Sequence, residues 1–164
     1  MRKNTEAYLG FALMWREEHF LSLAEDKLKK TYSDFFMESL SFEPQFSRYY
    51  HKEMGRPLYK KFVLTNTVVD KSTIKDIKIE AISIEDSLRV DGNRTVNIDP
   101  FYMDKDQVVV STSKYRGNRI YLGDGVFVEL ELFYHHGSFH PFVWTYTDYK
   151  DHIPFFNDLR KKIK

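Results

Sequence analysis

The second half of the chain alternates apolar and polar residues in short segments separated by glycine-containing turns, and this pattern constrains the fold most. Side chains on a strand point to opposite faces in turn, so a period of two predicts strands with one face on a core. The dipeptides Asp124-Gly125 and His136-Gly137 favour tight hairpins, because glycine adopts the torsions that such turns need. We predict an antiparallel meander with strands over residues 107–113, 119–122, 126–134 and 138–146.

The first hundred residues follow another pattern, in which a strand, a helix and a strand succeed one another twice. Apolar positions three and four residues apart predict the helices, whereas apolar runs or alternation predict the strands. The predicted elements are a strand over 7–14, a helix over 16–30, strands over 35–42 and 58–69, a helix over 74–88 and a strand that begins at 95. A long loop with one helical turn, over 43–57, joins the two units. Right-handed crossovers favour parallel pairing within each unit.

An amphipathic helix over 152–164 closes the chain, with its apolar residues placed to face the sheet. These elements predict an α+β fold, in which a mainly antiparallel but mixed sheet carries helices on at least one side. The length of 164 residues is typical of one domain, and we expect residues 1–164 to form a single domain with one core.

Composition excludes several classes of function. Lys and Arg number 25 against 24 Asp and Glu, so the net charge of +1 gives no strong signal for binding nucleic acid or an anionic membrane. The chain has no cysteine, which excludes disulfides, thiolate catalysis and cysteine-ligated zinc, and is typical of a reducing compartment. No apolar run approaches the roughly 18 residues of a membrane-spanning helix. We therefore expect a cytoplasmic protein that does not enter a membrane.

Polar residues gather just before Pro100, on a segment predicted to be the end of a strand. Alternation places Asn97 and Asp99 on one face, opposite the apolar residues beside them, and Arg94 precedes them. Strand ends often carry functional groups and arginine binds anions, so Arg94 and Asn97 are candidate ligand-binding residues and Asp99 a candidate catalytic one. The alternative, of about equal weight, is that Asn97 and Asp99 bond to backbone donors of the following turn.

A second group combines hydroxyls with cations. Three hydroxyl residues at 111–113 precede Lys114, Arg116 and Arg119, a combination that suits a phosphate or a carboxylate. Lys114 and Arg119 are therefore candidate ligand-binding residues. The segment is not a P-loop, because no glycine-rich turn opens a helix here. A solvated hairpin is the more frequent explanation for such charges.

The segment after Arg119 holds one aspartate between two glycines, Asp124, and then the carboxylates Glu129 and Glu131. Grouped carboxylates bind divalent cations or exchange protons, so Asp124 and Glu129 join Asp99 as candidate catalytic residues, with a divalent cation as a candidate cofactor. Exposure of these acids, with lysines of neighbouring strands as partners, is the commoner outcome.

The rings of Tyr121 and Trp144 are candidate walls of a ligand pocket. The rings of Trp144, Tyr146 and Tyr149 are suited to stacking on a planar ligand such as a base, or to forming a pocket wall. Aromatic residues that alternate on a strand nevertheless belong to a core more often than to a site.

The chain also resembles a known prokaryotic family, the domain of unknown function 4416, over nearly its whole length. Four sequence motifs are shared with the family, together with Lys114 and Glu129. Residues 46–62 contain an aromatic residue followed by Tyr-Tyr, Glu-Met-Gly, a leucine and a basic residue. The other three motifs are Arg-x-Val-Asn-Ile-Asp-Pro over 94–100, Arg-Ile-Tyr-Leu-Gly-Asp-Gly over 119–125 and Trp-Thr-Tyr-x-Asp-Tyr over 144–149. The resemblance implies no established activity. The chain departs from the family pattern at Phe101, Asn118, Gln107 and Ala81-Ile82, which would weaken any chemistry that those positions carry.

Three hypotheses follow. In the first, the candidate residues converge on one pocket that binds or transforms a small phosphorylated or nucleotide-like anion. In the second, the basic and aromatic surface makes the protein a non-enzymatic module that binds RNA or a protein partner. In the third, the same residues only stabilise the fold. The first requires side chains that are far apart in the sequence to meet in space.

Overall fold

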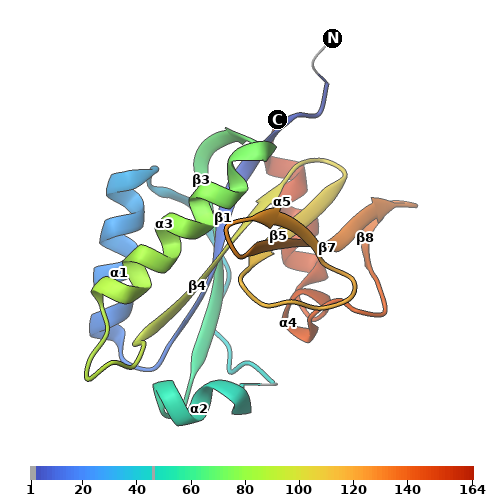
Figure 1. The fold of residues 1–164 in the computed structure, drawn as a ribbon. Coiled ribbons are helices and arrows are strands. Elements are labelled where there is room, and N and C mark those ends of the chain that lie inside the picture. Colours follow the sequence, from blue (N-terminus) through green and yellow to red (C-terminus); the bar gives the residue numbers. More distant parts are fainter. Residues whose placement is uncertain (1–2, 46) are drawn as a thin grey trace.

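The structure is a computed structural model that describes residues 3–45 and 47–164, so Phe46, where the family pattern begins, lies outside the described residues. Within them, a single sheet of eight strands is covered by helices (Figure 1). The strands are β1 (Glu6–Trp15), β2 (Phe35–Glu38), β3 (Tyr59–Asp70), β4 (Val96–Met103), β5 (Gln107–Thr112), β6 (Ile120–Gly123), β7 (Val126–His135) and β8 (Ser138–Pro141). The helices are α1 (Glu18–Thr31), α2 (Arg48–Met54), α3 (Ile74–Ser87), α4 (Thr147–Lys150) and α5 (Ile153–Lys162), with a 3-10 turn over Lys71–Thr73.

Every pairing between the described strands is antiparallel, in the order β2-β3-β1-β4-β5-β7-β6 with β8 also on β7. The α+β class and the antiparallel pairing of the later strands are confirmed, although β5 pairs with β7 and not with β6 as a simple meander requires. Parallel pairing within each strand-helix-strand unit is wrong. The two strands that α1 joins run in the same direction but have β3 between them, and those that α3 joins have β1 between them. This is the split β-α-β arrangement of ferredoxin-like folds, in which each helical crossover passes over one antiparallel strand.

The central strands separate two cores, because alternate side chains point to opposite faces of the sheet. Figure 1 shows α1 and α3 together on one face, where they pack on residues such as Leu13 and Ile98. Helix α5 covers the other face through Phe156, which packs against Phe62 and Phe101. Asn97 and Asp99 alternate with Ile98 and therefore lie on the α5 side, as alternation predicts.

Several element boundaries differ from those predicted. β2 ends at Glu38, and the segment predicted as a loop with one helical turn contains the seven-residue helix α2, which Met54 fixes by packing in a small apolar cluster. β8 ends at Pro141 rather than at 146, because the chain turns there and the Phe142 amide donates to Thr145 Oγ1. No helix formed by the described residues combines the length and the apolar character that crossing a bilayer requires.

Candidate functional site

The sheet opens between β4 and β5. These strands pair only from Phe101 to Met103, so the preceding half of β4 lacks a strand neighbour on that side. Pro100 contributes to the opening because proline has no N–H to donate to a neighbouring strand. Its carbonyl accepts a hydrogen bond from the Ser111 hydroxyl at 2.7 Å. The expectation that Pro100 ends the strand is wrong: β4 continues to Met103, and Pro100 lies where the ladder is interrupted.

Two side chains of α3 take the place of the missing strand. Glu85 Oε2 accepts the Ile98 N–H at 2.6 Å, and Lys78 Nζ donates to the Ile98 carbonyl at 3.0 Å. Both side chains are buried, with residue exposures of 4% for Glu85 and 3% for Lys78. Buried charged groups need such partners, so α3 satisfies the exposed backbone of β4 and brings charge into the middle of the sheet.

The opening forms a cleft of about 120 Å³. Its walls come from β4, from the end of β5 and the residues after it, from α3, and from segments at α2 and α4, with single residues from β1 and β3. The polar and charged residues that line it are Ser47, Tyr50, Lys60, Lys78, Glu85, Arg94, Asn97, Asp99, Ser111, Thr112, Ser113, Lys114, Tyr146, Thr147, Asp148 and Tyr149. Four of the nine sequence-predicted site residues, namely Arg94, Asn97, Asp99 and Lys114, therefore meet in one place.

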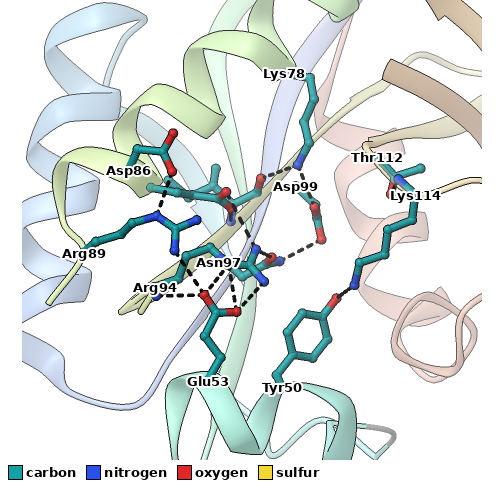
Figure 2. A network of polar contacts seen from close by, with 12 residues as sticks. Tyr50, Glu53, Lys78, Asp86, Arg89, Arg94, Asn97, Asp99, Thr112 and Lys114 are labelled. Carbon is teal, nitrogen blue, oxygen red and sulfur yellow. Dashed lines mark hydrogen bonds and ion pairs between the residues drawn. The ribbon is translucent and has the colours of Figure 1, made fainter. Parts of the chain in front are cut away.

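A continuous chain of polar contacts runs along one wall of the cleft (Figure 2). Lys78 Nζ binds Asp99 Oδ1 at 3.0 Å, and Asn97 Nδ2 donates to Asp99 Oδ2 at 2.9 Å. Arg94 Nη1 donates to Asn97 Oδ1 at 2.9 Å, while its Nε and Nη2 bind the carboxylate of Glu53 on α2. Asn97 and Asp99 thus bond to side chains within the cleft, and Arg94 is neutralised by Glu53.

Lys114 is the exception among the cleft cations. Lys60 pairs with Asp148, whereas Lys114 forms no ion pair within residues 3–45 and 47–164. Its Nζ donates to the Tyr50 hydroxyl at 3.0 Å and lies 4.1 and 4.5 Å from the ring centroids of Tyr49 and Tyr50. Figure 2 shows this contact crossing from the β5 side to α2. The cleft therefore holds one positive charge that no carboxylate of the described chain neutralises.

A second unused group lies deeper in the cleft. The Tyr149 hydroxyl is buried, and within the described residues it has no hydrogen-bond partner. Burial and the nearby carboxylate of Glu131 raise the pKa of Tyr149 well above its ordinary value, so the group stays a neutral donor. An unpaired buried hydroxyl is costly in free energy, so Tyr149 is a hydrogen-bond donor whose capacity no described residue uses.

The carboxylates of the cleft have opposite electrostatic environments. Burial raises the pKa of Glu85 to about 7, although the Lys78 ammonium opposes this effect. Burial also acts to raise the pKa of Asp99, but the ammonium groups of Lys78 and Lys60 outweigh it and leave that pKa below its usual range. Asp99 therefore keeps its negative charge at neutral pH, whereas Glu85 gains its charge only near neutral pH.

Arg119 and Glu129 lie behind the cleft rather than in its lining. Arg119 Nε binds Glu129 Oε2 at 2.7 Å, and both side chains are almost fully buried, so the expectation of exposed acids paired with lysines is wrong for Glu129. Arg119 also donates to the Lys114 carbonyl at 2.8 Å and to the Tyr146 hydroxyl. The pair supports the position of Lys114 but does not face the cleft.

The other three predicted residues lie elsewhere. Asp124 is mostly exposed and pairs with Lys75 at 3.1 Å, and Tyr121 is exposed on β6. Trp144 donates from Nε1 to the Leu130 carbonyl at 2.9 Å and stacks on Phe142, away from the cleft lining. The convergence expected of all nine residues is therefore only partial.

The described part of the chain contains no preformed metal site. No group of three or more His, Asp or Glu side chains in residues 3–45 and 47–164 is arranged to hold a metal ion. Asp99 and Asp148 both line the cleft, but each is already paired with a lysine.

Sequence reasoning did not single out Tyr50, Lys78 or Glu85, and it named Tyr149 only for its ring, as a candidate stacking surface or pocket wall, and not for its hydroxyl. The signal for two of them is the apolar stripe of α3, where Lys78 and Glu85 occupy positions that face the sheet. A charged residue on the buried stripe of a helix indicates a specific partner, because burial without one is unfavourable. Tyr50 and Tyr149 appear in the family pattern, but no local spacing connects them with Lys114.

Comparison with known proteins gives a family without a described activity. The search of curated proteins and that of solved structures found no match. A family model described as a domain of unknown function (DUF4416) matches residues 5–163 of the 164-residue chain. The chain belongs to the DUF4416 family.

Proposed function

We propose that the cleft binds a small molecule through a phosphate or carboxylate group. The observation that carries this proposal is Lys114, whose ammonium lines the cleft without a carboxylate partner in the described chain. The nearby cations Arg94, Arg119 and Lys78 add to the positive potential at Lys114. Lys114 is half-buried, and a cation that is partly withdrawn from water is stabilised by a nearby anion.

The other unused polar groups at the cleft are hydrogen-bond donors, which suit an anionic ligand. Tyr149 offers an unused hydroxyl donor, and an ammonium group has three N–H donors, of which Lys114 directs one at Tyr50. Phosphate and carboxylate oxygens accept several hydrogen bonds at once. The proposed ligand group is therefore an acceptor with a negative charge.

The size of the cleft limits the ligand. A cavity of about 10–15 Å³ holds one water molecule. The volume of the cleft is about 120 Å³. This space suits an anionic group with a few further atoms, and the remainder of a larger ligand would lie outside the cleft. A phosphorylated metabolite fits these limits.

Thermal unfolding in the presence of candidate anions tests the proposal. Inorganic phosphate, sugar phosphates, nucleoside monophosphates and small dicarboxylates are compared with chloride at equal ionic strength, and a ligand at about 100 times its Kd adds about 3 kcal/mol of stability. The substitution Lys114→Met is expected to abolish the response, whereas Lys150→Met, at an exposed lysine of α4, is expected to retain it. The proposal fails if no anion stabilises the wild type or if both variants respond like it.

A further inference from the structure

We infer that Lys114 is a nucleophilic amine, and that it forms an imine with a small anion that carries an aldehyde or ketone group. This inference rests on the proposed anion site and adds a covalent reaction to it. The ligand class becomes narrower: a carbonyl compound with a nearby carboxylate or phosphate, such as a 2-oxo acid.

Lys114 differs from the other lysines of the cleft in its partners. Lys60 and Lys78 each form an ion pair with a carboxylate, at 2.8 and 3.0 Å, so both side chains already have a charged partner. Lys114 instead donates to the Tyr50 hydroxyl, lies against the rings of Tyr49 and Tyr50, and has other cations nearby. Lysines that form imines are usually partly desolvated and close to another positive charge.

The electrostatics of the site support this difference. Burial lowers the pKa of Lys114, and the guanidinium groups of Arg94 and Arg119 lower it further, while Asp99 acts in the opposite direction. The net direction is downward, so a larger share of Lys114 is the free amine at neutral pH than for an exposed lysine. Only the free amine has the lone pair that attacks a carbonyl carbon.

The cleft retains groups for the anion after Lys114 has reacted. Lys78 directs two contacts at β4, to the Ile98 carbonyl and to Asp99, which leaves one of its three N–H donors. Tyr149 supplies a second unused donor. The carboxylate or phosphate of the bound molecule can therefore be held by Lys78 and Tyr149 while its carbonyl carbon faces Lys114.

The reaction balances without an oxidant or a metal. The lone pair of Lys114 Nζ forms the N–C bond, the C=O pair moves to oxygen, and a proton transferred from nitrogen gives the carbinolamine. The nitrogen lone pair then forms the C=N bond while the hydroxyl group takes a proton from Tyr50 and leaves as water, and the N–H proton of the resulting iminium returns to the Tyr50 oxygen. Tyr50 lies 3.0 Å from Nζ, and burial raises its pKa, so it remains protonated and can donate to the departing hydroxyl.

Reductive trapping in the wild-type protein tests the inference. Pyruvate and acetone, which differ in the carboxylate, are each incubated with the protein and sodium cyanoborohydride, and peptide mapping quantifies the adduct on every lysine. With pyruvate we expect Lys114 to react roughly tenfold faster than Lys60, Lys78 or the exposed Lys150. Acetone should lose most of this preference, and sulfate should slow the labelling of Lys114 by pyruvate. No substitution is needed, so misfolding cannot produce the result.

The outcomes separate the inference from the proposed function. Equal labelling of all four lysines, or an unlabelled Lys114, overturns the imine. If phosphate or sulfate still stabilises the wild type and not Lys114→Met, the anion site stands without the covalent step. If pyruvate labels Lys114 selectively and sulfate competes, both are supported. An adduct on Lys114 that forms equally fast with acetone overturns the requirement for an anionic carbonyl compound.

Discussion

Glu85 should make the stability of the protein decrease as the pH rises from 4.5 to about 7, and Glu85→Gln should remove this dependence. The side chain is 4% exposed and accepts the Ile98 N–H, and burial raises its pKa from 4.5 to about 7. Glutamine keeps the accepting oxygen and the shape but cannot ionise. The substitution therefore removes the titration while it preserves the hydrogen bond to β4.

The sign follows from the order of the two pKa values. Between pH 4.5 and about 7 the folded state binds more protons at Glu85 than the unfolded state does, so the free energy of unfolding falls as pH rises. Each pH unit between the two values is worth about 1.4 kcal/mol. The contribution is fully present below pH 4.5, and about 3 kcal/mol of it is lost by pH 8.

Urea unfolding of the wild type and Glu85→Gln, at a series of pH values from 4.5 to 8, measures the effect. The two proteins should have nearly equal free energies of unfolding at pH 4.5, and the variant should be more stable by about 3 kcal/mol at pH 8. Other titrating groups cancel in this difference because both proteins contain them. A difference that is constant across the series would show that Glu85 is ionised throughout, and would refute the reasoning.

Three further predictions concern the cleft and its surroundings. Sulfate should stabilise the wild type less at pH 8 than at pH 6, because ionised Glu85 reduces the positive potential of the cleft. The charge of sulfate is constant over this range, so equal thermal shifts at the two pH values would contradict the prediction. Gly10→Ala should destabilise the protein by about 1 to 3 kcal/mol in urea unfolding, since the added methyl group would overlap the buried ring of Phe101. Arg119→Met should cost about 3 to 5 kcal/mol by leaving Glu129 buried and unpaired, and adding Glu129→Gln should recover part of that loss; no recovery would mean that the ion pair is not the cause.

The secondary structure was largely predictable because local patterns determine it. The apolar stripe of α3 and the glycine turns of the meander gave elements close to those observed. Strand order was not predictable in the same way. Whether β3 enters between β1 and β2 depends on contacts between residues far apart in the sequence, and a helical crossover looks the same whether it joins adjacent strands or passes over one.

The predicted site residues also differ in whether local sequence or long-range contacts determine their positions. Arg94, Asn97 and Asp99 share one stretch of β4, so their proximity follows from local geometry. Asp124 was predicted as a site residue because it lies between two glycines. The structure explains the Gly-Asp-Gly sequence by the local backbone, because Gly123, Asp124 and Gly125 all have positive φ, at 103°, 53° and 77°. These torsions suit glycine and aspartate in a tight turn. The motif therefore reports on backbone geometry and not on chemistry.

The cleft exists because two features of the sequence coincide. Pro100 removes a donor from the side of β4 that faces β5, and α3 carries Lys78 and Glu85 at the level where the ladder is interrupted. Either feature alone would be unfavourable, since an open ladder leaves backbone groups unpaired and a charged pair on a buried helix face lacks partners. Together they satisfy each other and fix Asp99 and the cleft wall on a strand and a helix. Polar groups held on such rigid elements are positioned more accurately than groups on loops, which is what selective binding of a small anion requires.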